Sequence, residues 1–186
     1  MTERALTDFE QILLGSIAAI PRSAYDLKRH FSATPASVYQ PSPGALVPAL
    51  HRLERRGLLR VETDSSSGRR VRRVYHLTRP GRAAHQAWIR QPVAPGSVGR
   101  DLGLHLMRFV MMERELTRSE VLAFLTELAN ALDEFVTSME RYVASESHPG
   151  RHPRLALEHG IAVHRASLEW ARSAMNALRD QAPGAG

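Results

Sequence analysis

Arginine side chains concentrate in one short stretch of the sequence. Positions 51–82 hold ten arginines against three acidic residues, a net charge of +7 in 32 residues. The planar guanidinium group presents a fork of donors that fits phosphate oxygens and the edge of guanine. Residues 1–92 together carry +8, whereas residues 93–186 carry −2. This asymmetry predicts a polyanion-binding first half joined to a second half with a different task.

Part of this charge lies on a predicted helix. Leu46, Leu50 and Leu53 recur at the spacing of one helix face, so we expect them to point inward. Arg52 and Arg55 would then lie on the opposite face of the helix, where they could reach guanine edges or phosphates. The residues expected on that exposed face are Gly44, Pro48, His51, Arg52 and Arg55.

The limits of this helix follow from its breakers. Ser42 and Pro43 are typical of an N-cap and a first helical residue, and Gly57 is typical of a C-terminal cap. Pro48 would lie inside the helix, where it removes one backbone bond and should bend the first turns.

A β-hairpin is predicted directly after the helix. The runs 58–62 and 71–77 favour strands, and the small residues between them favour a turn. Charged residues on such a hairpin often protect a sheet edge against aggregation. The density of charge favours nucleic-acid binding instead, because four cations occur in five residues on the returning strand: Arg69, Arg70, Arg72 and Arg73.

The order of elements indicates how these groups are positioned. Capping boxes at Thr7–Glu10 and Ser23–Asp26 predict two earlier helices, and Thr78 with Pro80 predicts a fourth. Helix, helix, helix, strand, strand, helix is the order of a winged helix, whose third helix enters the major groove while the hairpin contacts the backbone or minor groove. The predicted DNA contacts are Tyr25, Lys28, Arg29, Gln40, Ser42, Gly44, His51, Arg52, Arg55, Arg69, Arg70, Arg72 and Arg73.

The second half is predicted to be helical. Residues 92–99 have the composition of a linker, and the helix after them is apolar nearly all round, so we expect it to be buried on several sides. Two long seams then alternate spacings of four and three, which favours helix pairing either within one chain or across a dimer. The predicted dimerisation residues are Val121, Leu125, Leu128, Leu132, Phe135, Met139, Leu157, Ile161, His164, Leu168 and Met175.

Other functions lack a pattern in the sequence. The absence of cysteine excludes disulfides and thiolate metal sites, and the spacing of His159 and His164 misses that of two metal ligands on one helix face. We find no catalytic triad, phosphate loop or paired carboxylates, so we expect no enzyme, cofactor or metal. The sequence shows no membrane span and no signal peptide, which predicts a cytoplasmic protein.

Several of these segments resemble one family. Residues 42–59 resemble the recognition-helix signature of PadR-family transcriptional regulators, and 72–82 resemble the exit of that family's wing. Residues 100–107 are similar to the start of the C-terminal helical domain of its longer members. The resemblance implies a homodimeric repressor that binds an inverted repeat and is released by a small aromatic or drug-like effector. Val47 departs from the family's tyrosine at this position, which removes one typical polar contact to DNA.

The sequence therefore predicts a mainly α-helical protein with a small β-hairpin wing. We expect a winged helix-turn-helix domain at 5–91, a linker at 92–99 and an α-helical dimerisation domain at 100–182. Alternative functions are a non-specific architectural DNA binder and a winged-helix adaptor that binds proteins. Aromatic and thioether side chains that could line an effector pocket are Trp88, Met107, Phe109, Met111 and Trp170.

Overall fold

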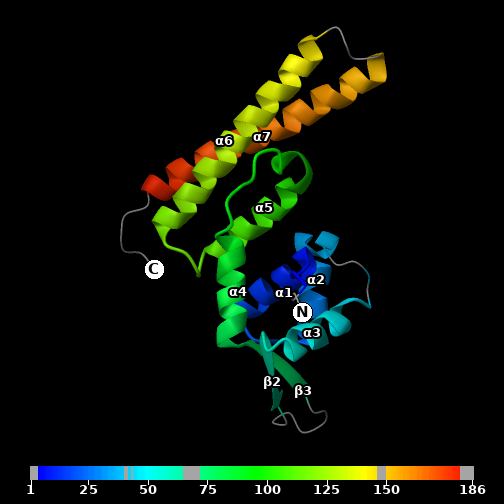
Figure 1. The fold of residues 1–186 in the computed structure, drawn as a ribbon, viewed down its shortest axis with the longest axis vertical. Coiled ribbons are helices and arrows are strands. Elements are labelled where there is room, and N and C mark those ends of the chain that lie inside the picture. Colours follow the sequence, from blue (N-terminus) through cyan, green and yellow to red (C-terminus); the bar gives the residue numbers. More distant parts are fainter. Residues whose placement is uncertain (1–3, 40–41, 43, 65–71, 146–149, 181–186) are drawn as a thin grey trace. The chain divides into compact units, whose positions relative to one another are not determined.

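The computed structural model describes residues 4–39, 42, 44–64, 72–145 and 150–180 (Figure 1). The chain divides into two compact units, one of residues 1–89 and 110–115 and the other of 90–109 and 116–186. The elements in order are α1 (Asp8–Ala19), β1 (Arg22–Ser23), α2 (Ala24–Ala33), the 3₁₀ helix η1 (Pro35–Tyr39), α3 (Leu46–Arg55), β2 (Leu59–Asp64), β3 (Arg72–Leu77), α4 (Arg79–Ile89), α5 (Val98–Met112), α6 (Arg118–Ala144) and α7 (Arg151–Asp180).

The first unit is the predicted winged helix. Both predicted capping boxes form, because the side chains of Thr7 and Ser23 accept from the backbone of Glu10 and Asp26, whose carboxylates accept from the cap backbone in return. The apolar side chains of α1, α2 and α3 make the core. Its fully buried members include Ile12, Leu13, Leu14, Leu27, Phe31, Leu50 and Leu53.

The sheet has three strands, in the order β1-β3-β2, all antiparallel. Tyr75 of β3 pairs with Val61 on one side and with Arg22 on the other. The sequence did not predict β1, because two residues are too few to show an alternating pattern. The described parts of the predicted hairpin agree with β2 and β3.

The start of α3 differs from the prediction. The helix begins at Leu46 after Ala45, with no side-chain cap, and the Ser42 carbonyl accepts from the Ala45 amide in a turn before it. Ser42 is therefore not the N-cap. Pro48 becomes the third helical residue, where the backbone N–H has no intrahelical partner, so the predicted loss of a hydrogen bond is wrong.

The end of α3 is as predicted. Gly57 adopts a φ of 68°, in the left-handed region that glycine enters most readily. Its amide donates to the Glu54 carbonyl at 2.9 Å, and the Leu58 amide donates to the Leu53 carbonyl at 3.0 Å. This pair of bonds is a Schellman motif, which ends the helix and turns the chain into β2.

The second unit contains the hairpin of α6 and α7, which lie side by side (Figure 1). The predicted seams face each other within one chain, which is one of the two pairings that the heptad spacing left open. Leu125, Leu128 and Leu132 of α6 are fully buried, and Ile161 and Leu168 of α7 are nearly so. Among the described residues, no helix combines the length and hydrophobicity needed to cross a bilayer.

Helix α5 does not have the apolar environment expected for it. Val110 is 66% exposed, whereas the polar side chains of His105 and Arg108 are buried. Arg108 donates to the Gln91 carbonyl, and its guanidinium carbon lies 5.0 Å from the centre of the Phe124 ring. Hydrogen bonding and a cation–π contact thus compensate for burial of this cation, which hydrophobic spacing alone could not predict.

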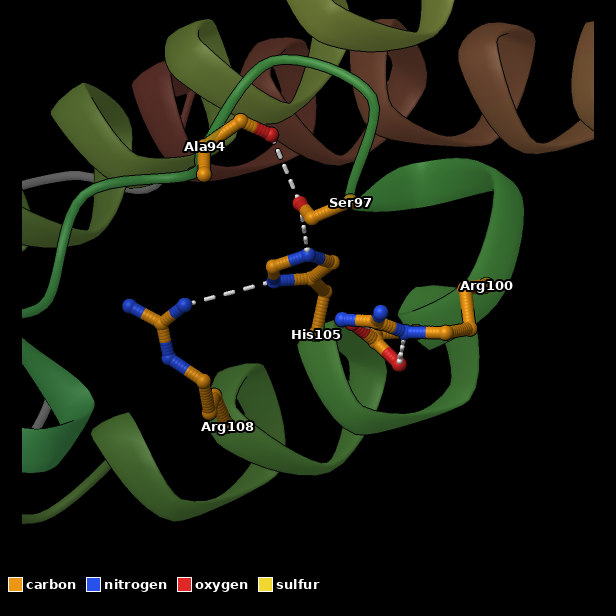
Figure 2. Close-up of polar contacts among 6 residues, drawn as sticks. Ala94, Ser97, Arg100, His105 and Arg108 are labelled. Atoms are coloured by element: carbon orange, nitrogen blue, oxygen red, sulfur yellow. Dashed lines mark hydrogen bonds and ion pairs between the residues drawn. The ribbon is translucent and has the colours of Figure 1, made fainter.

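His105 is the centre of a directed chain of hydrogen bonds (Figure 2). Arg108 can only donate, so its Nη1 donates to Nδ1 of His105 at 3.2 Å and places the ring proton on Nε2. Nε2 donates to the hydroxyl of Ser97 at 2.8 Å, and this hydroxyl donates to the Ala94 carbonyl at 2.7 Å. Protonation of Nδ1 would place its N–H opposite the Nη1 donor of Arg108, and this series of hydrogen bonds would break.

We therefore predict that acid destabilises the protein. Burial lowers the pKa of His105, and Arg108 lowers it further, against the opposing effect of Asp101. Burial likewise lowers the pKa of His85. Because the unfolded chain then binds more protons, the free energy of unfolding should fall as the pH drops below about 6.5. Urea unfolding at stepped pH values measures this change.

A variant assigns part of this effect to one residue. Gln at position 105 cannot take up a proton in this range, so His105→Gln should lose less stability on acidification than the wild type. An equal loss in both proteins would show that the hydrogen-bond chain of His105 does not contribute.

Candidate nucleic-acid interface

The exposed face of α3 forms a shallow concavity of about 500 Å³. Leu46, Leu50 and Leu53 point into the core as predicted, which leaves His51 and Arg55 exposed. A helix with one buried apolar face and one exposed polar face can lie in the major groove without losing its packing. The residues that line the concavity are Val47, Pro48, His51, Arg52, Glu54 and Arg55.

Arg52 is held by a buried carboxylate of α1. Its Nε donates to Oε1 of Glu10 at 2.8 Å, and Oε2 of Glu10 accepts from the Thr7 amide at 3.0 Å. Burial raises the pKa of Glu10, but the hydrogen bonds from Thr7 and Arg52 outweigh it and keep this pKa below its ordinary value. Arg52 therefore ties α3 to the start of α1, in addition to any contact with DNA.

Two arginines at the start of β3 are also paired. Arg72 contacts the Asp26 carboxylate of α2, and Nη2 of Arg73 lies 3.1 Å from both carboxylate oxygens of Glu54 on α3. Both arginines remain half exposed. These pairs orient β3 relative to α2 and α3, and phosphate groups would have to compete with the carboxylates for the guanidinium groups.

The acidic residue of each capping box has a second role. Glu10, Asp26 and Glu120 each close a capping box, and each also pairs with an arginine from a distant element. The partners are Arg52, Arg72 and Arg90. The sequence shows the boxes but gives no sign of the partners. The only sign of these ion pairs in the sequence was that each capping box places a carboxylate at the start of a helix.

Other predicted contacts are exposed cations without a protein partner. Among the described residues, the side chains of Lys28, Arg29 and Arg55 form no hydrogen bond or ion pair. Tyr25, on the same helix as Lys28, is 72% exposed. The first unit thus presents unpaired positive charge from α2 and α3, which is what a polyanion requires.

The remaining predicted contacts belong to the loop before α3 and to the wing. Ser42 and Gly44 are exposed, and a Cβ added at Gly44 would meet no atom within 4 Å. Gln40, Arg69 and Arg70 lie outside the described residues.

The predicted effector residues belong to both units. Trp88 is buried in the first unit, where its ring centre lies 6.3 Å from that of His85, and Met111 lies close to Gly15. Met107, Phe109 and Trp170 belong to the second unit. Phe109 and Trp170 form an edge-to-face pair with centres 5.3 Å apart, and both are half buried.

The predicted dimerisation residues pack within one chain. The ring of His164 lies 4.7 Å from that of Phe135, and its nitrogens lie 2.7 Å from the Gly160 carbonyl and 3.3 Å from the Val98 carbonyl. Their role in dimerisation stays a prediction. All eleven residues of the predicted set are buried or half-buried: Val121, Leu125, Leu128, Leu132, Phe135, Met139, Leu157, Ile161, His164, Leu168 and Met175. Within the described ranges, no three metal-ligating side chains gather at one place.

Two family profiles match the chain. Residues 13–87 match the family described as "Transcriptional regulator PadR-like family". Residues 101–179 match the family described as "Virulence activator alpha C-term". The two matches lie in the two predicted halves of the chain, and the PadR-like match runs from within α1, through α2, α3 and the wing, into α4.

Individual proteins are similar over most of the chain. "Probable transcriptional regulator Rv1176c" of Mycobacterium tuberculosis is 23% identical over 182 residues, which cover 91% of this chain and 96% of the relative. "Transcriptional regulator Rv3488" of the same organism is 56% identical over 46 residues, 25% of this chain and 42% of the relative. The crystal structure of Bacillus subtilis PadR in complex with operator DNA is 16% identical, with a TM-score of 0.45 over 94% of this chain and 99% of that one.

Proposed function

The chain belongs to the PadR-like family of DNA-binding transcriptional regulators, and from this premise we propose that it is a homodimeric repressor of an inverted-repeat operator. The family consists of regulators, not enzymes. The observation that carries the proposal is the exposed face of α3, where His51 and Arg55 lie free above a fully buried leucine face. In this proposal the protein acts on DNA in the cytoplasm.

The proposed contacts divide into two kinds. Helix α3 enters the major groove, where His51 in the middle of the helix and Arg55 at its end donate to base edges or to phosphates. Lys28 and Arg29 of α2 contact the flanking backbone, and the hairpin of β2 and β3 lies along it. Two copies of α3 in a dimer would be spaced by about one turn of DNA, ~34 Å, which makes the preferred site an inverted repeat.

The proposed domain limits are 5–91 for DNA binding, 92–99 for the linker and 100–182 for dimerisation.

Release by an effector is the second part of the proposal. The half-buried pair of Phe109 and Trp170 supports an aromatic effector, because a flat ring can stack on or meet the edge of these side chains. Such a ligand would change the packing of the second domain and thereby the spacing of the two α3 helices.

Selection from a random duplex library tests the function. At ~150 mM salt, the purified protein should enrich an inverted repeat and bind it at least ~10³-fold more tightly than a scrambled duplex. Equal binding of all duplexes with strong salt dependence would indicate a non-specific architectural protein instead. No binding to any duplex would favour an adaptor that binds other proteins.

Exposed apolar side chains on the outside of the α6–α7 hairpin allow a separate test of the proposed dimer. Tyr142, Leu155 and Val163 are large apolar side chains that remain exposed there, and Val163 is 42% exposed. We expect the wild type to be a dimer by light scattering and Val163→Glu to be a folded monomer, because a charge in an apolar interface is costly. A dimer of unchanged stability in Val163→Glu would place the interface elsewhere.

A further inference from the structure

A second concavity lies next to the exposed face of α3. It has a volume of about 310 Å³, and it lies between the segment before α1 and the end of α3. Liquid water occupies ~30 Å³ per molecule, so the concavity has room for a phosphodiester group. Its lining contains four guanidinium groups and a single carboxylate: Arg4, Ala5, Glu10, Arg52, Arg55 and Arg56.

The carboxylate does not neutralise this concavity. Both oxygens of Glu10 are used, one by Arg52 and the other by the Thr7 amide. Arg4 and Arg55 make no hydrogen bond or ion pair with any described residue. At least two cations therefore face a shared space without a protein anion, and the guanidinium fork matches the oxygens of a phosphate group.

The concavity continues the surface that faces DNA in the proposed function. Arg52 and Arg55 line both this concavity and the one on the exposed face of α3. Phosphates border the major groove on both sides, so a helix in the groove brings its flanks close to the backbone. We propose that the concavity binds a backbone phosphate of duplex DNA, which adds Arg4 and Arg56 to the interface. This inference rests on the proposed function.

Single charge deletions test the site. Arg4→Ala and Arg56→Ala should each weaken binding roughly three- to fivefold, equally for the selected and the scrambled duplex, and lower the salt slope by about one. Arg114→Ala is the matched control, because Arg114 is an exposed arginine of the same unit outside both concavities. Fluorescence anisotropy at several salt concentrations measures affinity and slope, and thermal melting confirms that each variant is folded.

The other outcomes separate this inference from the proposed function. If the wild type binds DNA but Arg4→Ala and Arg56→Ala behave like Arg114→Ala, only the phosphate site is overturned. A loss confined to the selected duplex also overturns it, because phosphate contacts do not depend on sequence. If inorganic phosphate raises the melting temperature through Arg4 while DNA affinity is unchanged, the site binds free anions and the DNA assignment is wrong. Absence of any duplex binding overturns both proposals.

Discussion

Leu128→Glu is expected to unfold the α6–α7 hairpin, with a loss of more than about 4 kcal/mol in the free energy of unfolding. Leu128 is fully buried between the two helices of one chain. A carboxylate at this position has no partner and would have to be desolvated or would admit water into the seam. Circular dichroism during urea unfolding measures the loss.

Val163→Glu is the matched control, because the same charge then stands at an exposed position of α7. We expect this variant to lose only the stability that dimerisation contributes, so its unfolding free energy should fall by less than that of Leu128→Glu. If Leu128→Glu instead gave a folded monomer of normal stability, Leu128 would face a second chain, and the pairing of the seams within one chain would be contradicted.

Arg52→Ala is expected to cost about 2–3 kcal/mol of stability as well as DNA affinity. The side chain of Glu10 is only 5% exposed, and it would lose its ion-pair partner. The low pKa of Glu10 means that this pair contributes stability above its ordinary pKa near 4.5, and that the contribution is lost as the pH falls below it. The stability lost by Arg52→Ala should therefore shrink in acid.

A double-mutant cycle separates the ion pair from other effects of Arg52. Glu10→Gln removes the buried charge, so Arg52→Ala should cost less stability in that background than in the wild type. Arg55→Ala should leave stability unchanged, because Arg55 has no partner among the described residues. Equal costs of Arg52→Ala in both backgrounds would show that Glu10 and Arg52 do not stabilise one another.

Local patterns allowed much of the fold to be predicted. The capping boxes, the inward leucines of α3 and the turn at Gly57 each depend on a few neighbouring residues, and each was confirmed. The start of α3 was wrong, because Ser42 and Pro43 have the residue types of a helix start but Ser42 instead accepts in a turn. The short β1 depends on a pairing with β3, which no local pattern of two residues can show.

The candidate site was less predictable than the fold. Sequence spacing identified the exposed cations of α3, but it could not show which of them have carboxylate partners. Arg52 and Arg55 have the same residue type on the same helix face, yet one is held by Glu10, 42 positions away, and the other is free. The burial of His105 and Arg108 was missed for the same reason, because their partners belong to the preceding segment and to α6.

Recognition of a DNA sequence by the exposed face of α3 is the proposal on which the function of this protein rests. Its most direct test is the ratio of affinities for the selected and the scrambled duplex, measured at ~150 mM salt in the wild type, His51→Ala and Lys28→Ala. We predict a ratio of at least ~10³ in the wild type, a roughly tenfold lower ratio in His51→Ala, and an unchanged ratio with weaker binding overall in Lys28→Ala. A wild-type ratio near one would contradict sequence recognition by this face.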